Sequence, residues 1–121
     1  MNIHESAEDY LETILMLKNR LGAVRSIDVV NEMNFSKPSI SIAMKRFREN
    51  GLIEMDNDGY ITLLPPGLAI AERTYTRHGI LTRLLVQLGV SEQTAAEDAC
   101  KIEHDLSDET FEKIRGFVSQ E

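Results

Sequence analysis

The residue types best suited to metal chemistry lie near the end of the chain, in the run Asp98–Ser107. Cys100, Glu103 and His104 are spaced i, i+3 and i+4 there, a spacing that places side chains on one face of a helix, about one turn apart. A thiolate, a carboxylate and an imidazole are ligand types that bind divalent transition metals. The spacing therefore predicts a metal site, although surface acids with one buried thiol would show the same pattern.

Three residues upstream have the types needed to complete such a site. Asp9 and Glu12 are spaced i, i+3 in a segment of helical periodicity, so both carboxylates can point the same way. His78 lies within another helical segment, where a lone histidine is more often a hydrogen-bonded structural residue than a ligand. A packed junction of three helices could bring all six side chains together. Mixed oxygen, nitrogen and sulfur donors fit Fe²⁺ or Mn²⁺, while Zn²⁺, Co²⁺ and Ni²⁺ are harder to exclude.

Charge is distributed unevenly along the chain. The 121 residues carry a net charge of −7, which at first argues against nucleic acid as a partner. From Lys18 to Arg48, however, seven basic residues stand against two acidic ones, whereas from Leu84 to Glu121 nine acidic residues stand against three basic ones. A phosphate backbone responds to a local basic surface. The acidic part suits cation binding, or it is simply a solvated surface.

Composition limits the class of protein. With 42% hydrophobic residues the chain can bury a core, and no apolar run approaches the ~18 residues of a membrane span. The single cysteine cannot form an internal disulfide, and the N-terminus shows no signal-peptide pattern. We therefore expect a cytoplasmic protein with a free thiol, and neither a membrane nor a small organic substrate as its partner.

The elements that must position these residues are mostly helices. Six helices are expected, over about 6–21, 26–33, 36–50 and 68–88, and then from Ser91 and from Ser107 onward. Two strands, 52–55 and 60–63, are joined by a turn-rich segment. The residues expected to face the core are Ile27, Val30 and Met33, then Ile40, Met44 and Phe47, and then Leu81, Leu84, Leu85 and Leu88.

Helix, short helix, turn, helix and two-stranded hairpin is the order of a winged helix-turn-helix. We therefore predict a mainly α fold with a small two-stranded β-wing. Residues 1–64 are expected to form the winged helix-turn-helix DNA-binding domain. Residues 65–121 are expected to form a helical metal-binding and dimerisation domain.

The helix that follows Ser36 is the one expected to read DNA, because the second helix of this motif lies in the major groove. If Ile40 and Met44 face inward, Ile42 lies on the exposed face, where it could touch a thymine methyl; it would be a core residue if the stripe were rotated. Hydroxyls and the Lys37 ammonium at the start of the helix can bond phosphate oxygens. The predicted DNA-binding residues are Arg25, Ser36, Lys37, Pro38, Ser39, Ser41, Ile42, Lys45 and Arg46.

Together these features resemble the diphtheria-toxin-repressor and manganese-transport-regulator family of metal-dependent transcriptional repressors. The resemblance implies a homodimer that grips a palindromic DNA operator and represses metal-uptake genes when Mn²⁺ or Fe²⁺ is plentiful. It is carried by Glu8–Ile14, Ser36–Ser41, Leu63–Gly67, Arg77-His78 with Leu84-Leu85, and Asp98–Glu109. By position, the residues that fall where the family places metal ligands are Asp9, Glu12, His78, Cys100, Glu103 and His104.

The chain departs from the family pattern in ways that limit the transfer. Manganese-type members pair Asp on the first helix with Glu at the position of Cys100, whereas iron-type members pair Met with Cys, so Asp9 with Cys100 leaves the metal open. Thr82 and Ala96 stand where iron-type members have ligands of a second site, so that site is not expected. Ile42 replaces a polar residue that can reach bases. No third, SH3-like domain is expected after Glu121.

Three other classes of protein fit parts of the pattern. A winged-helix DNA-binding regulator could respond to a non-metal effector, with the acids as surface residues. A winged helix could also be a protein-interaction module without salt-dependent DNA affinity. Cys100 and His104 could imitate the thiol–base pair of an enzyme, but the sequence shows neither a glycine-rich oxyanion loop nor a third orienting group, so we expect no enzymatic activity.

Overall fold

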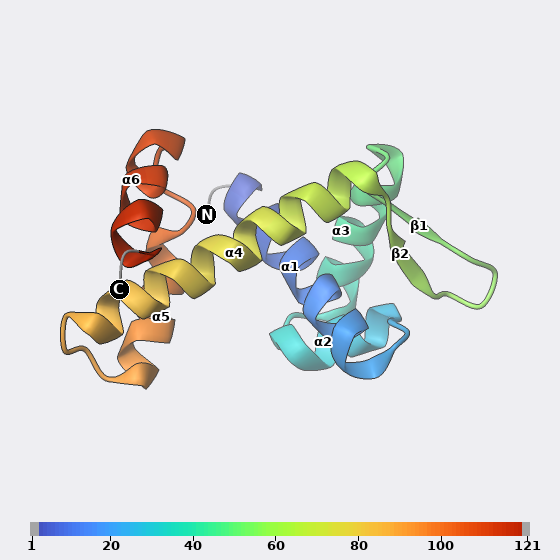
Figure 1. Ribbon diagram of the computed structural model, residues 1–121. Coiled ribbons are helices and arrows are strands. Elements are labelled where there is room, and N and C mark those ends of the chain that lie inside the picture. Colours follow the sequence, from blue (N-terminus) through green and yellow to red (C-terminus); the bar gives the residue numbers. More distant parts are fainter. Residues whose placement is uncertain (1–2, 120–121) are drawn as a thin grey trace. The chain divides into compact units, whose positions relative to one another are not determined.

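The structure, a computed structural model, describes residues 3–119 of the chain, with side chains over residues 7–118. Within these residues the predicted fold class, mainly α with a small β-wing, is confirmed. Contacts divide the chain into two compact units, Met1–Glu72 and Arg73–Glu121. No helix in the described part combines the length and the apolar character that a membrane span requires. The elements, in order, are α1 (Ile3–Leu21), α2 (Ser26–Met33), α3 (Lys37–Glu49), β1 (Ile53–Met55), β2 (Ile61–Leu63), α4 (Pro65–Gln87), α5 (Glu92–Ile102) and α6 (Asp108–Ser119) (Figure 1).

The first unit encloses one hydrophobic core between its helices and the sheet. α1 contributes Leu11, Ile14 and Leu17, which share one face because they recur at helical spacing. α3 contributes Ile40 and Met44, as its apolar stripe predicts, and each of these five side chains is at most 2% exposed. Fixing the inner face of α3 in this way leaves the opposite face of the same helix to solvent.

α2 departs from the sequence-based expectation in its buried face. The prediction that Ile27 faces the core is wrong, because Ile27 is 43% exposed and Val29 is fully buried instead. Val30 and Met33 pack against the core beside Val29. Ile27 precedes Val29 by two residues, which turns it about 200° around the helix axis and away from that face. The N-cap of α2 is Arg25, and its N–H donates to Asp28 Oδ2 at 2.9 Å.

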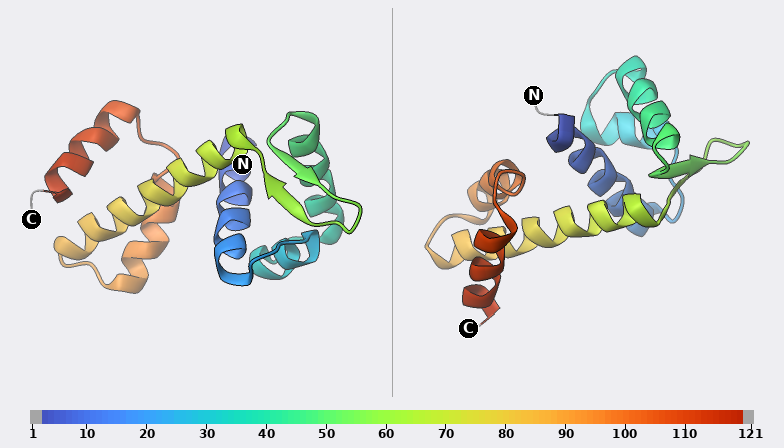
Figure 2. Two further views of the ribbon diagram at one scale, coloured as in Figure 1. Left: turned by 45° about the vertical axis from the view of Figure 1, so that its right-hand side comes forward. Right: turned by 90° about the horizontal axis from the view of Figure 1, so that it is seen from above.

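The hairpin of β1 and β2 forms the predicted wing, and it extends beyond the helices of its unit (Figure 2, right-hand view). At its tip, Asp56 Oδ1 accepts hydrogen bonds from the backbone N–H groups of Asp58 and Tyr60, both at 2.9 Å. Gly59 has a φ of 85°, a conformation that favours glycine. The antiparallel register pairs Ile53 with Leu63, Glu54 with Thr62, and Met55 with Ile61.

α4 begins at Pro65, three residues before the predicted start near Leu68. The two prolines fit the first turn of a helix, where a missing N–H leaves no hydrogen bond unmade. Gly67 lies against the backbone before β1, since a Cβ at this position would lie 2.1 Å from the Leu52 carbonyl oxygen. This close approach requires glycine and joins the start of α4 to the wing.

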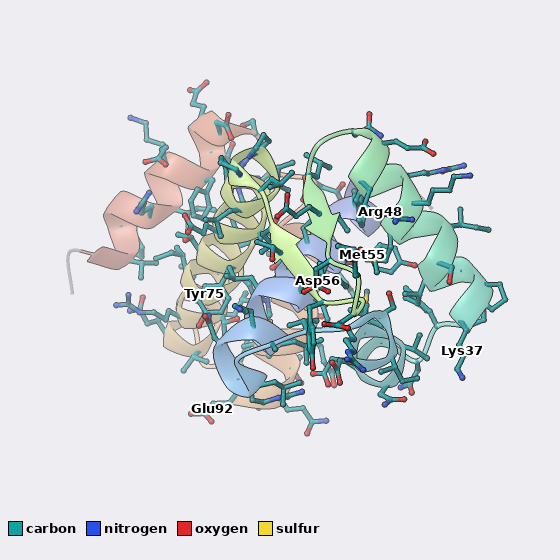
Figure 3. The ribbon with its side chains drawn as sticks, turned by 90° about the vertical axis from the view of Figure 1, so that its right-hand side faces the viewer. Lys37, Arg48, Met55, Asp56, Tyr75 and Glu92 are labelled. Carbon is teal, nitrogen blue, oxygen red and sulfur yellow. The ribbon has the colours of Figure 1, made fainter. Side chains whose placement is uncertain are left out.

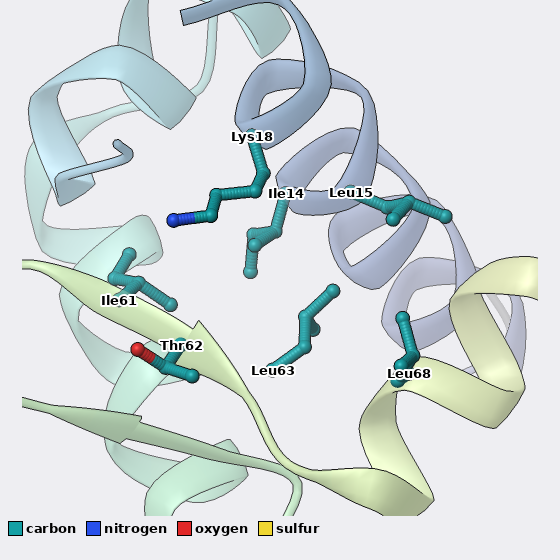
Figure 4. A pocket seen from close by; sticks show the side chains of 7 residues that line it. All are labelled: Ile14, Leu15, Lys18, Ile61, Thr62, Leu63 and Leu68. Carbon is teal, nitrogen blue, oxygen red and sulfur yellow. The ribbon is translucent and has the colours of Figure 1, made fainter. Parts of the chain in front are cut away.

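The first turns of α4 also contribute to an apolar pocket of the first unit. Ile14 from α1, Leu63 from β2 and Leu68 from α4 line this pocket, and Figure 4 shows their side chains pointing toward one another. Lys18 lies at the same pocket with its ammonium directed away from these three side chains (Figure 4). The pocket shows how closely α1, β2 and the start of α4 approach within the first unit.

The second unit consists of α4 from Arg73 onward, α5 and α6. Hydroxyl side chains cap both later helices: Ser91 Oγ accepts from Thr94 N–H at 3.3 Å, and Ser107 Oγ accepts from Thr110 N–H at 3.1 Å. The buried apolar residues of this unit are Leu81, Ala95, Ala99, Phe111 and Val118.

Leu88 does not belong to the buried stripe of α4, contrary to the prediction. It is 70% exposed, because α4 ends at Gln87 and Leu88 lies in the turn before Gly89. Leu81 is fully buried, and Leu84 and Leu85 are half-buried. The predicted stripe is therefore right over its first turns and wrong at its end.

Candidate metal centre

Three donor atoms converge within the second unit. His78 Nδ1 lies 3.0 Å from Glu103 Oε2 and 3.7 Å from Cys100 Sγ. One donor atom from each residue lies within 4.8 Å of the other two. His78 is separated from the other two by 22 and 25 positions along the chain, so the convergence depends on how α4 packs against the α5 segment. An imidazole, a thiol and a carboxylate thus meet in one place.

The helix that carries Cys100 ends one residue before Glu103. The expectation that α5 includes Glu103 and His104 is therefore wrong, since α5 ends at Ile102. Glu103 still has helical dihedral angles, with φ −61° and ψ −26°, and its N–H donates to Ala99 O at 3.0 Å. Its side chain consequently stays about one turn from Cys100. His104 lies in the following turn, where its Nε2 is 3.5 Å from Glu103 Oε1.

Glu103 has the most buried side chain of this group. None of that side chain is exposed, whereas 29% of the His78 side chain is. Its Oε1 atom is buried and makes no hydrogen bond within the described residues, which is costly for a carboxylate unless another positive group completes its surroundings. Cys100 is exposed and Glu103 is buried. The alternative of surface acids with one buried thiol is therefore wrong for Cys100 and Glu103.

The pKa of His78 indicates which charge the arrangement favours. The pKa of His78 is raised from 6.5 to about 10, mainly by its hydrogen bond to Cys100 and then by its hydrogen bond to Glu103, although burial acts in the opposite direction. These neighbours therefore stabilise positive charge at the point where the three donors meet. A divalent cation brings such charge and accepts nitrogen, sulfur and oxygen ligands together. The donor set and the unbonded Glu103 Oε1 both fit a transition-metal ion.

The remaining predicted ligands lie in the first unit. Asp9 and Glu12 are both on α1, three residues apart, and Glu12 is 8% exposed. The sequence predicts no second metal site, because Thr82 and Ala96 stand where its ligands would be. The Thr82 hydroxyl donates to the His78 carbonyl at 2.7 Å. Ala96 has no side-chain donor atom to offer a metal.

Arg77 belongs to a motif that carries the family resemblance but is not among the predicted site residues, yet its side chain is only 5% exposed. It shares the buried stripe of α4 with Thr74 and Leu81 at helical spacing. Its guanidinium donates to the backbone carbonyl of Glu103 at 3.0 Å. Arg77 could have been identified from the sequence by one signal: it is a charged residue within an apolar stripe, directly before the candidate ligand His78.

The outer face of α3 carries most of the residues predicted to bind DNA. Ile42 is 58% exposed, so the alternative that it belongs to the core is wrong. Ser36 caps the helix by accepting from Ser39 N–H at 3.2 Å, and Lys37 projects outward from this end (Figure 3). Before α2, the Arg25 guanidinium lies 4.3 Å from the centroid of the Tyr60 ring. All nine residues predicted to bind DNA are exposed: Arg25, Ser36, Lys37, Pro38, Ser39, Ser41, Ile42, Lys45 and Arg46.

Comparison with known proteins places both units in one family. Residues 2–61 match the family described as "Iron dependent repressor, N-terminal DNA binding domain". Residues 65–120 match the family described as "Iron dependent repressor, metal binding and dimerisation domain". The chain is 34% identical over 116 residues to the transcriptional regulator MntR of Escherichia coli O157:H7, covering 96% of this chain and 75% of that protein. It is 31% identical over 118 residues to an HTH-type transcriptional regulator of Methanocaldococcus jannaschii, covering 96% and 94%.

Solved structures give the same grouping. A manganese-dependent transcriptional repressor in complex with manganese matches with a TM-score of 0.85 at 25% identity, over 93% of this chain and 52% of that one. IdeR of T. acidophilum matches with a TM-score of 0.79 at 25% identity, over 88% and 51%. The chain thus spans about half the length of these solved relatives. The family resemblance expected from the sequence is therefore confirmed, and the chain belongs to the iron-dependent repressor family of metal-dependent, DNA-binding transcriptional regulators.

Proposed function

We propose that this chain is a metal-responsive repressor in which Mn²⁺ or Fe²⁺ switches DNA binding by α3 and its surroundings. The observation that carries the proposal is the meeting of His78, Cys100 and Glu103 donors within 4.8 Å. It occurs in a chain whose other unit is a winged helix-turn-helix. The proposal assigns metal binding, and no catalysis, to Cys100.

The proposed ligand set is larger than the three converging side chains. Octahedral coordination, which suits Mn²⁺, needs more than three donors, and carboxylates are suitable oxygen ligands for it. We assign the further positions to Asp9, Glu12 and His104, whose positions agree with the family pattern. The thiolate of Cys100 is a softer ligand that also suits Zn²⁺, so Zn²⁺, Co²⁺ and Ni²⁺ are the competing ions.

In this proposal, the properties of His78, Asp9 and Glu12 determine how metal binding would control DNA binding. A bound ion would supply the positive charge that lets several carboxylates share one place. His78 can offer Nδ1 as a ligand only after it loses the proton that its neighbours favour, so proton and metal compete there. Asp9 and Glu12 belong to α1 of the DNA-binding unit, and ligation by them would make that unit sensitive to metal. The ion shifts an equilibrium only by its difference in affinity between two conformations.

The proposed DNA partner is a palindromic operator bound by a homodimer in the cytoplasm, with metal-uptake genes as the regulated targets. Lys37 and the nearby hydroxyls at the start of α3 would bond phosphates, while Ile42 would touch a thymine methyl. The dimer mate would cover exposed apolar side chains of the second unit. Three such side chains are Tyr75, Leu88 and Phe117, at 53%, 70% and 58% exposure.

The test is the metal dependence of DNA binding at fixed salt. DNA fragments are selected by the full chain from a random pool in the presence of Mn²⁺ or, without oxygen, Fe²⁺. Affinity is then measured by fluorescence anisotropy with the metal and with a chelator. The proposal expects tight binding only with metal. Equal affinity under both conditions would support the alternative, a winged-helix regulator that responds to a non-metal effector.

A further inference from the structure

We propose that Arg77 is a positioning residue of the candidate metal centre, because it holds the backbone at Glu103 in the place from which the carboxylate meets His78. The inference rests on the proposed function, since it concerns the metal affinity of the same site. It assigns a role to a residue that would not itself contact the metal.

The Arg77 guanidinium connects α4 to the whole segment that follows α5. Nη1 donates to the backbone carbonyl of Glu103 at 3.0 Å and to that of Leu106 at 2.9 Å. Nη2 donates to Asp108 Oδ1 at 2.6 Å, and the guanidinium carbon lies 5.0 Å from the centroid of the Phe111 ring. Only arginine offers this many donors in a rigid fork. The side chain therefore fixes the turn between α5 and α6 at several points.

These contacts satisfy groups that the end of a helix leaves without partners. The last carbonyls of a helix have no intrahelical donor, and Glu103 is the C-cap of α5. Arg77 supplies the missing donor to the Glu103 carbonyl from the neighbouring helix. Without it, a buried carbonyl would lose its hydrogen bond, and the turn would rearrange to reach another donor.

Arg77 and His78 are adjacent on α4 and contact opposite ends of the same residue. Arg77 contacts the main-chain carbonyl of Glu103, and His78 contacts its side-chain carboxylate at 3.0 Å. Any shift of the Glu103 backbone relative to α4 therefore changes the distance between two proposed ligand atoms. Partners that orient ligands in this way commonly control metal affinity.

The charge of Arg77 is compensated within the same cluster. Asp108 pairs with it through Oδ1, so the guanidinium adds little net positive charge that would repel a cation. Arg73, one turn earlier on α4, also donates to Asp108 Oδ1, at 2.9 Å, but its side chain is 58% exposed. Among the described residues Arg73 donates to no carbonyl of the turn. Arg73 is consequently a matched control for Arg77: it is the same residue type on the same helix with the same acidic partner.

The experiment titrates the full chain with Co²⁺ and records the thiolate-to-cobalt absorption that reports ligation by Cys100. The variants are Arg77→Met, Arg77→Lys and the control Arg73→Met, and each metal-free protein is first checked by thermal unfolding. Arg77→Met is expected to weaken Co²⁺ binding by about 10–100-fold, as loss of an orienting partner does, and to change the absorption spectrum. Arg77→Lys should lie between Arg77→Met and the original chain, and Arg73→Met should bind and absorb as the original chain does.

The inference would be overturned if the Arg77 variants bound Co²⁺ with the affinity and spectrum of the original chain, even with lowered thermal stability, since the role would then be structural only. If Arg77→Met does not fold, Arg77→Lys decides by the same comparison. Failure of the original chain itself to bind Co²⁺ would overturn the proposed function together with this inference. The two failures are therefore distinguishable in one series of titrations.

Discussion

Replacing Glu103 by Gln removes one buried negative charge from the candidate centre and keeps the shape of the side chain. The carboxylate lies 3.0 Å from His78 Nδ1, and none of the side chain is exposed. In the metal-free protein the change should lower the free energy of unfolding by about 1–3 kcal/mol, because the protonated His78 loses a charged hydrogen-bond partner, which the removal of a buried carboxylate offsets only in part. The effect on metal binding should be larger.

The expected loss of metal affinity follows from the distances in the site. The donor atoms of His78, Cys100 and Glu103 lie within 4.8 Å of one another, so an ion between them lies closer than that to the carboxylate. Two unit charges ~4 Å apart interact by ~4 kcal/mol at an effective dielectric constant of ~20. Since ~1.4 kcal/mol is a factor of ten in an equilibrium constant, Glu103→Gln should weaken binding of a divalent cation by at least about a thousandfold.

Thermal unfolding with and without Mn²⁺ measures this loss. At a metal concentration ~100 times its dissociation constant, the original chain should gain ~2.7 kcal/mol in its free energy of unfolding. At the same concentration Glu103→Gln should gain less than ~0.1 kcal/mol. Glu97→Gln, which changes an exposed acid of α5, is the control and should keep the full gain. An undiminished gain in Glu103→Gln, or an equal loss in Glu97→Gln, would refute the reasoning.

Three further predictions concern the start of α4, the DNA-binding face and the choice of metal. Gly67→Ala should destabilise the protein by about 1–3 kcal/mol in chemical denaturation, because its Cβ would lie 2.1 Å from the Leu52 carbonyl oxygen; stability equal to the original would contradict that close approach. Ile42→Ala should change the free energy of unfolding by less than about 0.5 kcal/mol, since the side chain is 58% exposed. The same substitution should weaken binding to the selected DNA by about 1 kcal/mol, and unchanged DNA affinity would show that Ile42 makes no contact. Cys100→Glu should lower the dissociation constant for Mn²⁺ relative to that for Zn²⁺, because a hard carboxylate replaces a soft thiolate. An unchanged ratio of the two dissociation constants in competition titrations would count against ligation by Cys100.

Local sequence rules predicted the first unit well where a single pattern decided the structure. Ser36 caps α3 and Pro38 falls in its first turn, and the apolar stripe that includes Ile40 and Met44 is buried. The prediction of the buried face of α2 was wrong because the apolar residues of this eight-residue helix are compatible with two different faces. Val29 rather than Ile27 is buried because of how α2 packs against α1 and α3, and no pattern within α2 alone contains that information.

The candidate site could be predicted only in part for the same reason. The proximity of Cys100 and Glu103 is local and follows from helical spacing. The arrival of His78 is not local: its residue type made it a candidate, but only a packed junction of helices or the family resemblance could indicate that it reaches Cys100 and Glu103. The hydrogen bonds of Arg77 span 26 to 31 positions along the chain, so the residue that orders this turn could not be found from periodicity alone.

The most direct test is an anomalous difference map from crystals of the full chain grown with Mn²⁺, measured on both sides of the manganese absorption edge. The account predicts one strong peak in bonding contact with His78 Nδ1, Cys100 Sγ and Glu103 Oε2. A manganese peak elsewhere on the chain, or no peak at saturating Mn²⁺, would contradict it.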